Sequence, residues 1–214
     1  MAEVVLIRHG ETAWSRTGQH TGVSDISLTT AGERQAQSLG TALVGRRFGL
    51  VLSSPRQRAR RTAELSGLTG IEIDSNLAEW DYGGYEGQTT ADISAALGRP
   101  WSVWDDGVCP GATPGETLNQ VAGRAAAVLK RIHPVLGADD DVLLVAHGHV
   151  LRVLAAVWLG LPPVAGALLA LSAGSLSTLG FEHSRPVLTS WNTHSMQVSP
   201  AGPPLTIRRS SHQE

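Results

Sequence analysis

The sequence predicts an α/β fold, a three-layer α/β/α sandwich with a largely parallel central sheet. Short apolar runs rich in Val, Leu and Ile alternate along the chain with longer segments whose apolar residues recur at helical spacing. Strands that alternate with helices are typical of a sheet covered by helices on both faces. The 214 residues, of which 42% are hydrophobic and 17% charged, suit a single domain with a substantial core.

The first half of the chain is predicted to hold three short strands, at residues 4–7, 50–52 and 71–73. A capping box of Thr30 and Glu33 is expected to begin the helix after the first strand, and Gly45 is expected to end it. A further helix is expected to follow the second strand and to reach about Leu65.

Residues 79–115 interrupt this alternation because they are rich in Gly, Trp, Asp and Pro and show little periodicity. We interpret them as a long excursion with a short helix at about residues 90–97. Loops of this length are usually lids or binding loops, so the excursion is expected to contribute to a functional site.

After the excursion the chain returns to alternating elements. Thr117 and Gln120 form a second predicted capping box, followed by a helical stripe that runs to Ile132. The remaining predicted elements are a strand at 142–146, a helix at about 150–159 and a hairpin with strands at 177–181 and 187–191. Residues 199–214 are polar and contain Pro, so we expect a loose tail beyond a single domain of residues 1–198.

The charge of the chain argues against polyanionic partners. The net charge is −2 and the pI is near 6.4, so no strong overall field would gather nucleic acid or an anionic membrane. The apolar stretch before Arg8 is too short for a signal peptide or a membrane span, and a cytoplasmic location is the resulting expectation. Because the net charge is slightly negative, an anionic substrate would have to be attracted by a cluster of cationic residues at its binding site.

Cys109 is the single cysteine, and its neighbours offer no activating base. A lone thiol forms no internal disulfide and no thiolate zinc site, so Cys109 is expected to be inert. His147 and His149 have the spacing of a metal pair, but no third ligand cluster accompanies them. We predict neither a metal site nor a cofactor.

Charged residues follow three of the predicted strands. Arg8 and His9 follow the first strand, a run of arginines within residues 56–61 follows the second, and His147 follows the strand at 142–146. In open α/β sheets, ligands bind outside the carboxyl ends of the strands. We therefore expect these side chains to gather at one edge of the sheet.

Residues of these types fit phosphoryl transfer without a metal. The transition state spreads negative charge over three oxygens, which guanidinium groups bind with paired donors that stay charged. A neutral imidazole can attack the phosphorus in line, and a carboxylic acid can protonate the leaving oxygen. Glu79, at the start of the excursion, is the candidate acid, with Asp81 and Glu86 as rivals.

Five segments of the sequence, in order, resemble the motifs of the histidine phosphatase superfamily, whose fold is phosphoglycerate mutase-like. They are LIRHGETAW (6–14), SSPRQRARRTAE (53–64), LAEWDYGGYEG (77–87), PGET (114–117) and VAHGHVLRV (145–153). Together they cover most of the chain from Val4 to about Leu159. The resemblance implies metal-independent chemistry through a phosphohistidine.

Carried over residue by residue, the resemblance implies five catalytic roles. His9 would be the nucleophile that becomes phosphohistidine, and Arg8 and Arg58 would bind the phosphoryl oxygens. His147 would donate a hydrogen bond to the transferring group. Glu79 would protonate the leaving oxygen and then accept a proton from the attacking water.

A further group of residues is predicted to bind substrate or phosphate. They are Gly10, Ser15, Thr21, Gly22, Trp80, Tyr82, Gly148 and His149. Gly10 is expected to let the backbone approach the phosphate. Many members of the family have Asn where this chain has Ser15, and a hydroxyl offers a shorter reach. Arg152, by contrast, is expected to be a structural ion-pair residue.

The superfamily contains both mutases and phosphatases. Mutases carry a long basic insertion after the Glu motif, whereas residues 88–115 here are compact and have only Arg99 as a strong cation. We therefore favour hydrolysis of a small phosphorylated metabolite, in a branch with acid phosphatases and sugar bisphosphatases. A phosphoglycerate-type mutase and a non-catalytic phospho-ligand binding protein are the alternatives. The apolar region 159–171 suits either core or the interface of a homodimer.

Overall fold

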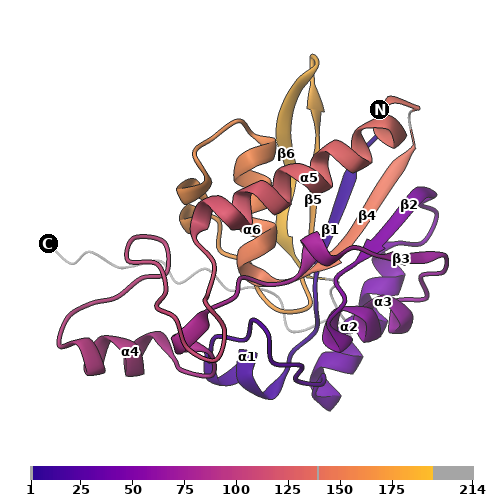
Figure 1. Ribbon diagram of the computed structural model, residues 1–214. Helices are drawn as coiled ribbons and strands as arrows, with labels where there is room; N and C mark the ends of the chain where they lie inside the picture. Colours follow the sequence, from indigo (N-terminus) through magenta and orange to yellow (C-terminus); the bar gives the residue numbers. More distant parts are fainter. Residues whose placement is uncertain (1, 139, 195–214) are drawn as a thin grey trace, which may run out of the picture.

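A computed structural model describes residues 2–138 and 140–194 (Figure 1). Within them, a six-stranded sheet has the order β3-β2-β4-β1-β5-β6. Its strands are β1 (Val4–Arg8), β2 (Phe48–Ser53), β3 (Ile71–Ile73), β4 (Asp141–Ala146), β5 (Leu176–Glu182) and β6 (Arg185–Thr193). The first four run parallel to one another, whereas β5 is antiparallel to β1 and forms a hairpin with β6.

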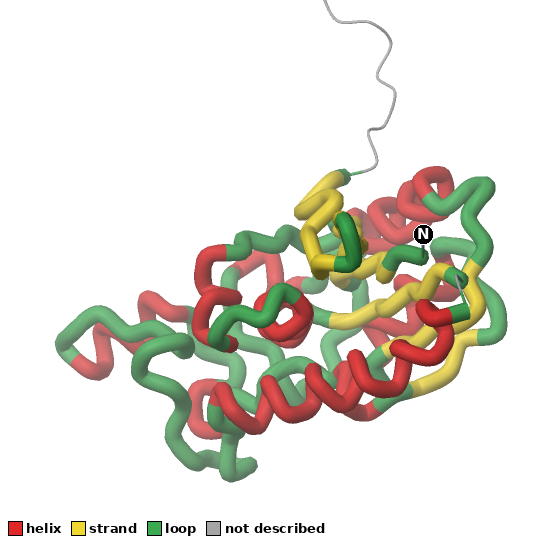
Figure 2. The backbone as a smooth tube through the Cα atoms, turned by 90° about the horizontal axis from the view of Figure 1, so that it is seen from above, coloured by secondary structure: helices red, strands yellow, loops and turns green. Residues whose placement is uncertain are grey.

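Successive residues of β1 point into two separate cores, one on each face of the sheet. Val4 and Leu6 pack in one cluster with α5 (Leu118–Gly137) and α6 (Gly148–Trp158). Val5 and Ile7 pack in the other with α2 (Thr30–Ala42) and α3 (Gln57–Leu65). A parallel strand covered on both faces needs the continuous apolar sequence that the chain has here. The predicted three-layer α/β/α sandwich is confirmed, and Figure 2 shows α5 running along one side of the strands.

Most predicted elements are confirmed, with bounds that differ by a few residues. Helix α4 (Thr90–Leu97) has the predicted limits, and Thr117 and Gln120 form the capping box that begins α5. The N-cap of α2, however, is Thr29 and not Thr30. Thr29 has extended backbone and accepts a hydrogen bond from the Gly32 N–H, so its neighbour already belongs to the first turn.

Four short helical segments are not predicted by the sequence, and the 3₁₀ turn at Gly83–Tyr85 is one of them. Helix α1 (Ala13–Thr17) has no buried residue and therefore no apolar stripe to reveal it, and it depends on a capping box between Thr12 and Ser15. The 3₁₀ turns η1 (Ser75–Leu77) and η3 (Pro163–Leu168) are likewise too short for a periodic signal.

The excursion of residues 79–115 contributes to the same core as the sheet. It contains the 3₁₀ turn η2 (Gly83–Tyr85) and α4, and it lies beyond the carboxyl ends of the parallel strands (Figure 1). Trp80, Ile93 and Trp101 are buried in the cluster that includes α5 and α6. These apolar anchors fix the excursion over the end of the sheet. The predicted tail of residues 199–214 lies outside the described residues.

Candidate active site

The predicted catalytic side chains converge at the carboxyl ends of β1 and β4. Arg8 and His9 leave β1, and His147 leaves β4, its parallel neighbour in the sheet. Arg58 reaches the same place from α3, and Glu79 comes from the start of the excursion. A cavity of about 150 Å³ opens there, lined by Arg8, His9, Ser15, Gly18, Gln19, His20, Thr21, Glu79, Tyr82, Gly148, His149, Arg152 and Leu171.

His9 is almost fully buried, and its hydrogen bond defines which ring nitrogen is free. Nδ1 lies 2.7 Å from the carbonyl oxygen of Gly10, and a carbonyl only accepts hydrogen bonds. Nδ1 therefore carries the proton, and Nε2 keeps its lone pair. Burial, and then the charges of Arg58 and Arg8, hold the pKa of His9 well below its ordinary value of 6.5. The ring is thus neutral at physiological pH, and its Nε2 has the free lone pair that a nucleophile needs.

The two arginines lie at different depths. Arg58 is fully buried and donates to the Thr21 and Ser24 carbonyls, at 2.8 Å each, and to His147 at 3.1 Å. Neither Arg58 nor His147 is among the residues that line the cavity, but the charge of Arg58 lowers the pKa of His9. Arg8 does line the cavity and donates through Nη1 to the Leu171 carbonyl. Among the described residues, nothing accepts from its buried Nε–H, which leaves that donor for an anionic oxygen.

His147 lies beside His9 with its ring in an edge-on arrangement. The two ring centroids are 5.1 Å apart, with an interplanar angle of 62°. Nδ1 of His147 faces Arg58, and Nε2 lies 2.7 Å from the Oγ of Ser54. Burial, followed by the charge of Arg58, lowers the pKa of His147 well below its ordinary value. This second imidazole is therefore also neutral.

Glu79 is held against the first turn of α6. Oε1 accepts from the Val150 N–H at 2.9 Å, and Oε2 accepts from the His149 N–H at 3.0 Å. A carboxylate at a helix N-terminus satisfies donors that have no partner within the helix. Because α6 begins directly after His147, one helix end positions both the second histidine and the candidate acid.

Arg124 of α5 holds the backbone that leads into Glu79. It donates to the Asn76 and Ala78 carbonyls at 2.7 and 2.9 Å. It also forms a two-pronged ion pair with Glu116, with both N–O distances at 2.8 Å. Glu116 in turn accepts from the Asp81 N–H. The segment on either side of Glu79 is thereby tied to the long helix.

Five of the eight predicted substrate-binding residues line the cavity. They are Ser15, Thr21, Tyr82, Gly148 and His149. The Ser15 hydroxyl also accepts from the Thr12 N–H at 2.8 Å, so it is committed to the cap of α1. The Tyr82 hydroxyl and Nδ1 of His149 are 2.6 Å apart.

The other three, Trp80, Gly10 and Gly22, do not line it. Trp80 is fully buried in the core, where its indole N–H donates to the Glu116 carbonyl. The Gly10 N–H donates to Thr62, and a Cβ on Gly10 would lie 2.3 Å from the Gly32 carbonyl oxygen. Packing against α2 therefore requires a glycine at this position. A Cβ on Gly22 would likewise meet the Trp80 carbonyl oxygen at 2.3 Å.

Five residues that line the cavity are not among the predicted site residues, namely Gly18, Gln19, His20, Arg152 and Leu171. His20 and Arg152 are the two with ionisable side chains. His20 stacks on Tyr82 at 4.7 Å and on Trp101 at 5.3 Å, and burial lowers its pKa to about 4. Arg152 forms no ion pair with the described residues. It donates instead to the Gly166 and Ala167 carbonyls at 2.9 Å each and stacks over Trp104 at 4.6 Å. Its position three residues after His149 on one helix face was the signal available in the sequence.

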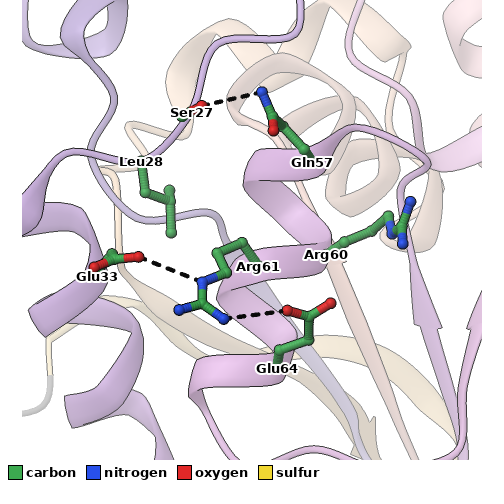
Figure 3. Close-up of a pocket in the computed structure, with 7 residues that line it drawn as sticks. All are labelled: Ser27, Leu28, Glu33, Gln57, Arg60, Arg61 and Glu64. Carbon is green, nitrogen blue, oxygen red and sulfur yellow. Dashed lines mark hydrogen bonds and ion pairs between the residues drawn. The ribbon is translucent and has the colours of Figure 1, made fainter.

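A larger groove, of about 470 Å³, lies between α2 and α3 (Figure 3). None of the predicted catalytic residues lines it. Its Arg61 is flanked by Glu33 and Glu64, each with an N–O distance of 3.4 Å (Figure 3). These carboxylates offset the arginine charge and would repel an anion, so the smaller cavity is the candidate active site.

A neutral, buried imidazole between cationic groups, at the carboxyl end of a parallel sheet, suits an enzyme that transfers phosphoryl groups. The sequence profile of the histidine phosphatase superfamily (branch 1) matches residues 4–194. The chain belongs to this superfamily, as its motifs indicated, and it is a phosphatase.

Individual relatives include both phosphatases and a mutase. An acid phosphatase of Mycobacterium tuberculosis is 42% identical over 183 residues, which cover 84% of this chain and 87% of the relative. A sedoheptulose 1,7-bisphosphatase of Saccharomyces cerevisiae is 36% identical, over 73% of this chain and 67% of the relative. A probable phosphoglycerate mutase of Photorhabdus laumondii is 32% identical, over 89% and 90%. The solved structure of a Mycobacterium tuberculosis open reading frame product superimposes with a TM-score of 0.84 at 38% identity, covering 91% of this chain and 99% of that one.

Two further observations concern the described residues only. No group of three or more His, Cys, Asp or Glu side chains among them is arranged to hold a metal ion. None of their helices combines the length and apolarity needed to cross a membrane.

Proposed function

We propose that this phosphatase hydrolyses a small phosphorylated metabolite through a phosphohistidine at His9, without a metal ion. The observation that carries the proposal is the free lone pair on Nε2 of a neutral His9, in a cavity that also contains an unpartnered Arg8 donor. Such an imidazole is poised for attack, and the guanidinium supplies the charge that a transferring phosphoryl group needs.

In the first step, Nε2 of His9 attacks the phosphorus while the bond from phosphorus to the leaving oxygen breaks. Arg8 binds the phosphoryl oxygens from the cavity wall, and the charge of Arg58 adds to the field at His9. Glu79, which lines the same cavity, enters this step as the neutral carboxylic acid, gives its proton to the leaving alkoxide and leaves the step as the carboxylate.

In the second step, a water molecule attacks the phosphohistidine from the side that the alcohol has left. The Glu79 carboxylate takes the proton from this water, the bond from phosphorus to Nε2 breaks, and inorganic phosphate is released. His9 returns to its neutral form, which its lowered pKa favours.

We propose a phosphorylated sugar as the substrate class, and a bisphosphate in particular. Neutral hydrogen-bonding groups from His20, Tyr82 and His149 line the cavity beyond His9 and suit the hydroxyl groups of a sugar. Arg152 adds a second cation to the same cavity, which suits a second phosphate. The similarity to a sedoheptulose 1,7-bisphosphatase supports this class.

The test of the reaction is phosphate release from 4-nitrophenyl phosphate in EDTA, with His9→Ala as the variant. We expect activity in the unmodified protein and a loss of kcat of about a thousandfold or more in the variant, because the nucleophile is gone. The exposed His133 on α5 provides the matched control, His133→Ala, which should keep full activity. A loss below about tenfold in His9→Ala would refute covalent catalysis at this residue.

A panel of sugar phosphates and phosphoglycerates, read by phosphate release and by product analysis, separates the alternatives. Interconversion of phosphoglycerates without phosphate release would identify a mutase. Tight binding of a phosphorylated ligand with no turnover of any substrate would identify a non-catalytic binding protein. Rapid hydrolysis of sugar bisphosphates is the expected result.

A further inference from the structure

Ser54 is a fully buried residue directly after β2 that the roles above leave unused. Its Oγ lies 2.7 Å from Nε2 of His147, on the side of the ring opposite to Arg58. Nε of Arg58 lies 3.1 Å from Nδ1 of the same ring. Both ring nitrogens of His147 are therefore engaged by the protein itself.

These two contacts determine the protonation of His147. A guanidinium N–H only donates, so Nδ1 must accept and cannot carry a proton. A neutral imidazole has one N–H, which must then be on Nε2, and the Ser54 hydroxyl oxygen accepts it. The lowered pKa of His147 agrees with a ring that stays neutral.

Ser54 is itself rigidly placed. Its N–H donates to the Val145 carbonyl at 2.9 Å, which ties it to the end of β4. Its Oγ also accepts from the Arg56 N–H at 3.3 Å, and its carbonyl accepts from the Ser53 hydroxyl at 3.1 Å. Because β4 holds its backbone and the Arg56 N–H holds its hydroxyl, Ser54 can define the direction of the His147 ring.

We propose that Ser54 is a positioning residue that holds His147 in the Nε2–H tautomer, with its ring edge-on to His9. The inference rests on the active site proposed above. It means that the Ser54 hydroxyl accepts the Nε2 proton of His147 in the free enzyme, and that a phosphoryl oxygen which accepts this proton must share it with Ser54 or replace that contact. The ring is thereby oriented before the substrate arrives, and no freedom of the imidazole has to be lost at the transition state.

Ser54→Ala tests this role against the adjacent Ser53→Ala. Both serines are fully buried, and both variants lose one hydroxyl, but within the described part of the chain the Ser53 hydroxyl bonds to the Ser54 carbonyl and not to His147. For 4-nitrophenyl phosphate we expect Ser54→Ala to lower kcat about tenfold with KM within about twofold, because a buried N–H loses its partner. Ser53→Ala should keep kcat within about twofold, and Ser54→Thr should recover activity relative to Ser54→Ala.

A spectroscopic measurement decides the tautomer independently of activity. Long-range ¹H–¹⁵N spectra of protein labelled with ¹⁵N-histidine, assigned with His147→Gln, should show the Nε2–H form for His147. In Ser54→Ala this single form should give way to exchange or to the Nδ1–H form. The unmodified protein alone supplies the main result, so the test survives a variant that fails to fold.

Two results would overturn the inference. One is an Nδ1–H or doubly protonated His147 in the unmodified protein, and the other is equal kcat in Ser54→Ala and Ser53→Ala. If His9→Ala keeps its activity, the proposed catalytic site itself is wrong. If His9→Ala is inactive and the two serine variants are equal, only the role of Ser54 is wrong.

Discussion

Both carboxyl oxygens of Glu79 accept hydrogen bonds from the first turn of α6. Glu79 also lines the cavity. The backbone donors fix its position to within a hydrogen-bond length, which a proton donor to a leaving oxygen requires. Asp81, a rival acid by sequence, is instead engaged by the Thr113 hydroxyl and the Gly83 N–H. Glu86, the other rival, accepts from the Gly22 and Ser24 N–H groups and so organises a loop.

Glu79→Gln should separate substrates by their leaving groups. Nitrophenolate leaves without a proton, so its kcat should fall by less than about tenfold, whereas a sugar phosphate should lose about a hundredfold or more. Parallel kinetics on the two substrates measure this ratio. Glu33→Gln, which removes a carboxylate paired with Arg61 outside the cavity, is the control and should affect neither substrate. Equal losses on both substrates would remove Glu79 from the role of acid.

At the scale of elements, the long helix α5 acts on the site without touching it. Arg124, on α5, donates hydrogen bonds to backbone carbonyls of the segment that ends at Glu79. Its ion pair with Glu116 holds the loop that precedes α5. The excursion and the sheet are thus joined by one guanidinium with several simultaneous contacts. Such a junction depends on the planar fork of donors, which lysine lacks.

Arg124→Lys should therefore lower kcat for sugar phosphates by about tenfold, because Glu79 is no longer held in place, and should affect nitrophenyl phosphate much less. The steady-state kinetics of both substrates provide the measurement. Arg34→Lys, at an exposed position on α2, is the matched control and should leave both rates unchanged. A similar loss with both substrates would indicate general damage to the fold and would contradict a positioning effect on the acid.

At the scale of the whole molecule, buried neutral histidines link stability to pH. Burial lowers the pKa of four histidines below the ordinary value of 6.5, namely His9, His20, His147 and His149. In the unfolded chain these rings regain their ordinary pKa and bind protons below about pH 6.5. The unfolded state then binds more protons than the folded state, so stability falls as the pH decreases through this value.

The free energy of unfolding should thus decrease between pH 7 and pH 5, by about 1.4 kcal/mol per pH unit for each histidine that stays neutral in the fold. Urea denaturation at several pH values measures the slope. His20→Phe should reduce this slope by the share of one histidine, whereas His133→Phe, at an exposed position, should leave it unchanged. Stability that rises on acidification from pH 7 to pH 5 would contradict buried neutral imidazoles.

The parts of the fold that could be predicted from the sequence are those with local signals. Apolar runs defined the strands, and Thr117 with Gln120 marked the start of α5, because periodicity and capping act within a few residues. The motifs also indicated which strand ends carry the charged residues. Thr29 was missed because two adjacent threonines offer the same local signal, and only the backbone conformation distinguishes them.

The part of the active-site cavity lined by His20 and Arg152, here called the outer cavity, could not be predicted in the same way. His20 faces the cavity because a loop and a helix far apart in the sequence meet there, and no local pattern encodes that meeting, whereas the spacing of Arg152 from His149 was the one local signal. Trp80 shows the converse error. An aromatic residue in a glycine-rich segment suggested a substrate wall, but tertiary packing buries it and satisfies its indole N–H.

The close contact of Gly10 with Gly32 limits which positions of this enzyme can be substituted when its specificity is redesigned. The loop after the nucleophile rests on α2 backbone to backbone, and a Cβ on Gly32 would come within 2.1 Å of the Glu11 carbonyl oxygen. Exchanges at His20 or Arg152 alter what the outer cavity accepts and leave this junction intact. A methyl group at residue 32, remote from any ligand, would instead shift the nucleophile, so directed evolution of new specificities should sample the cavity rim and spare the two glycines.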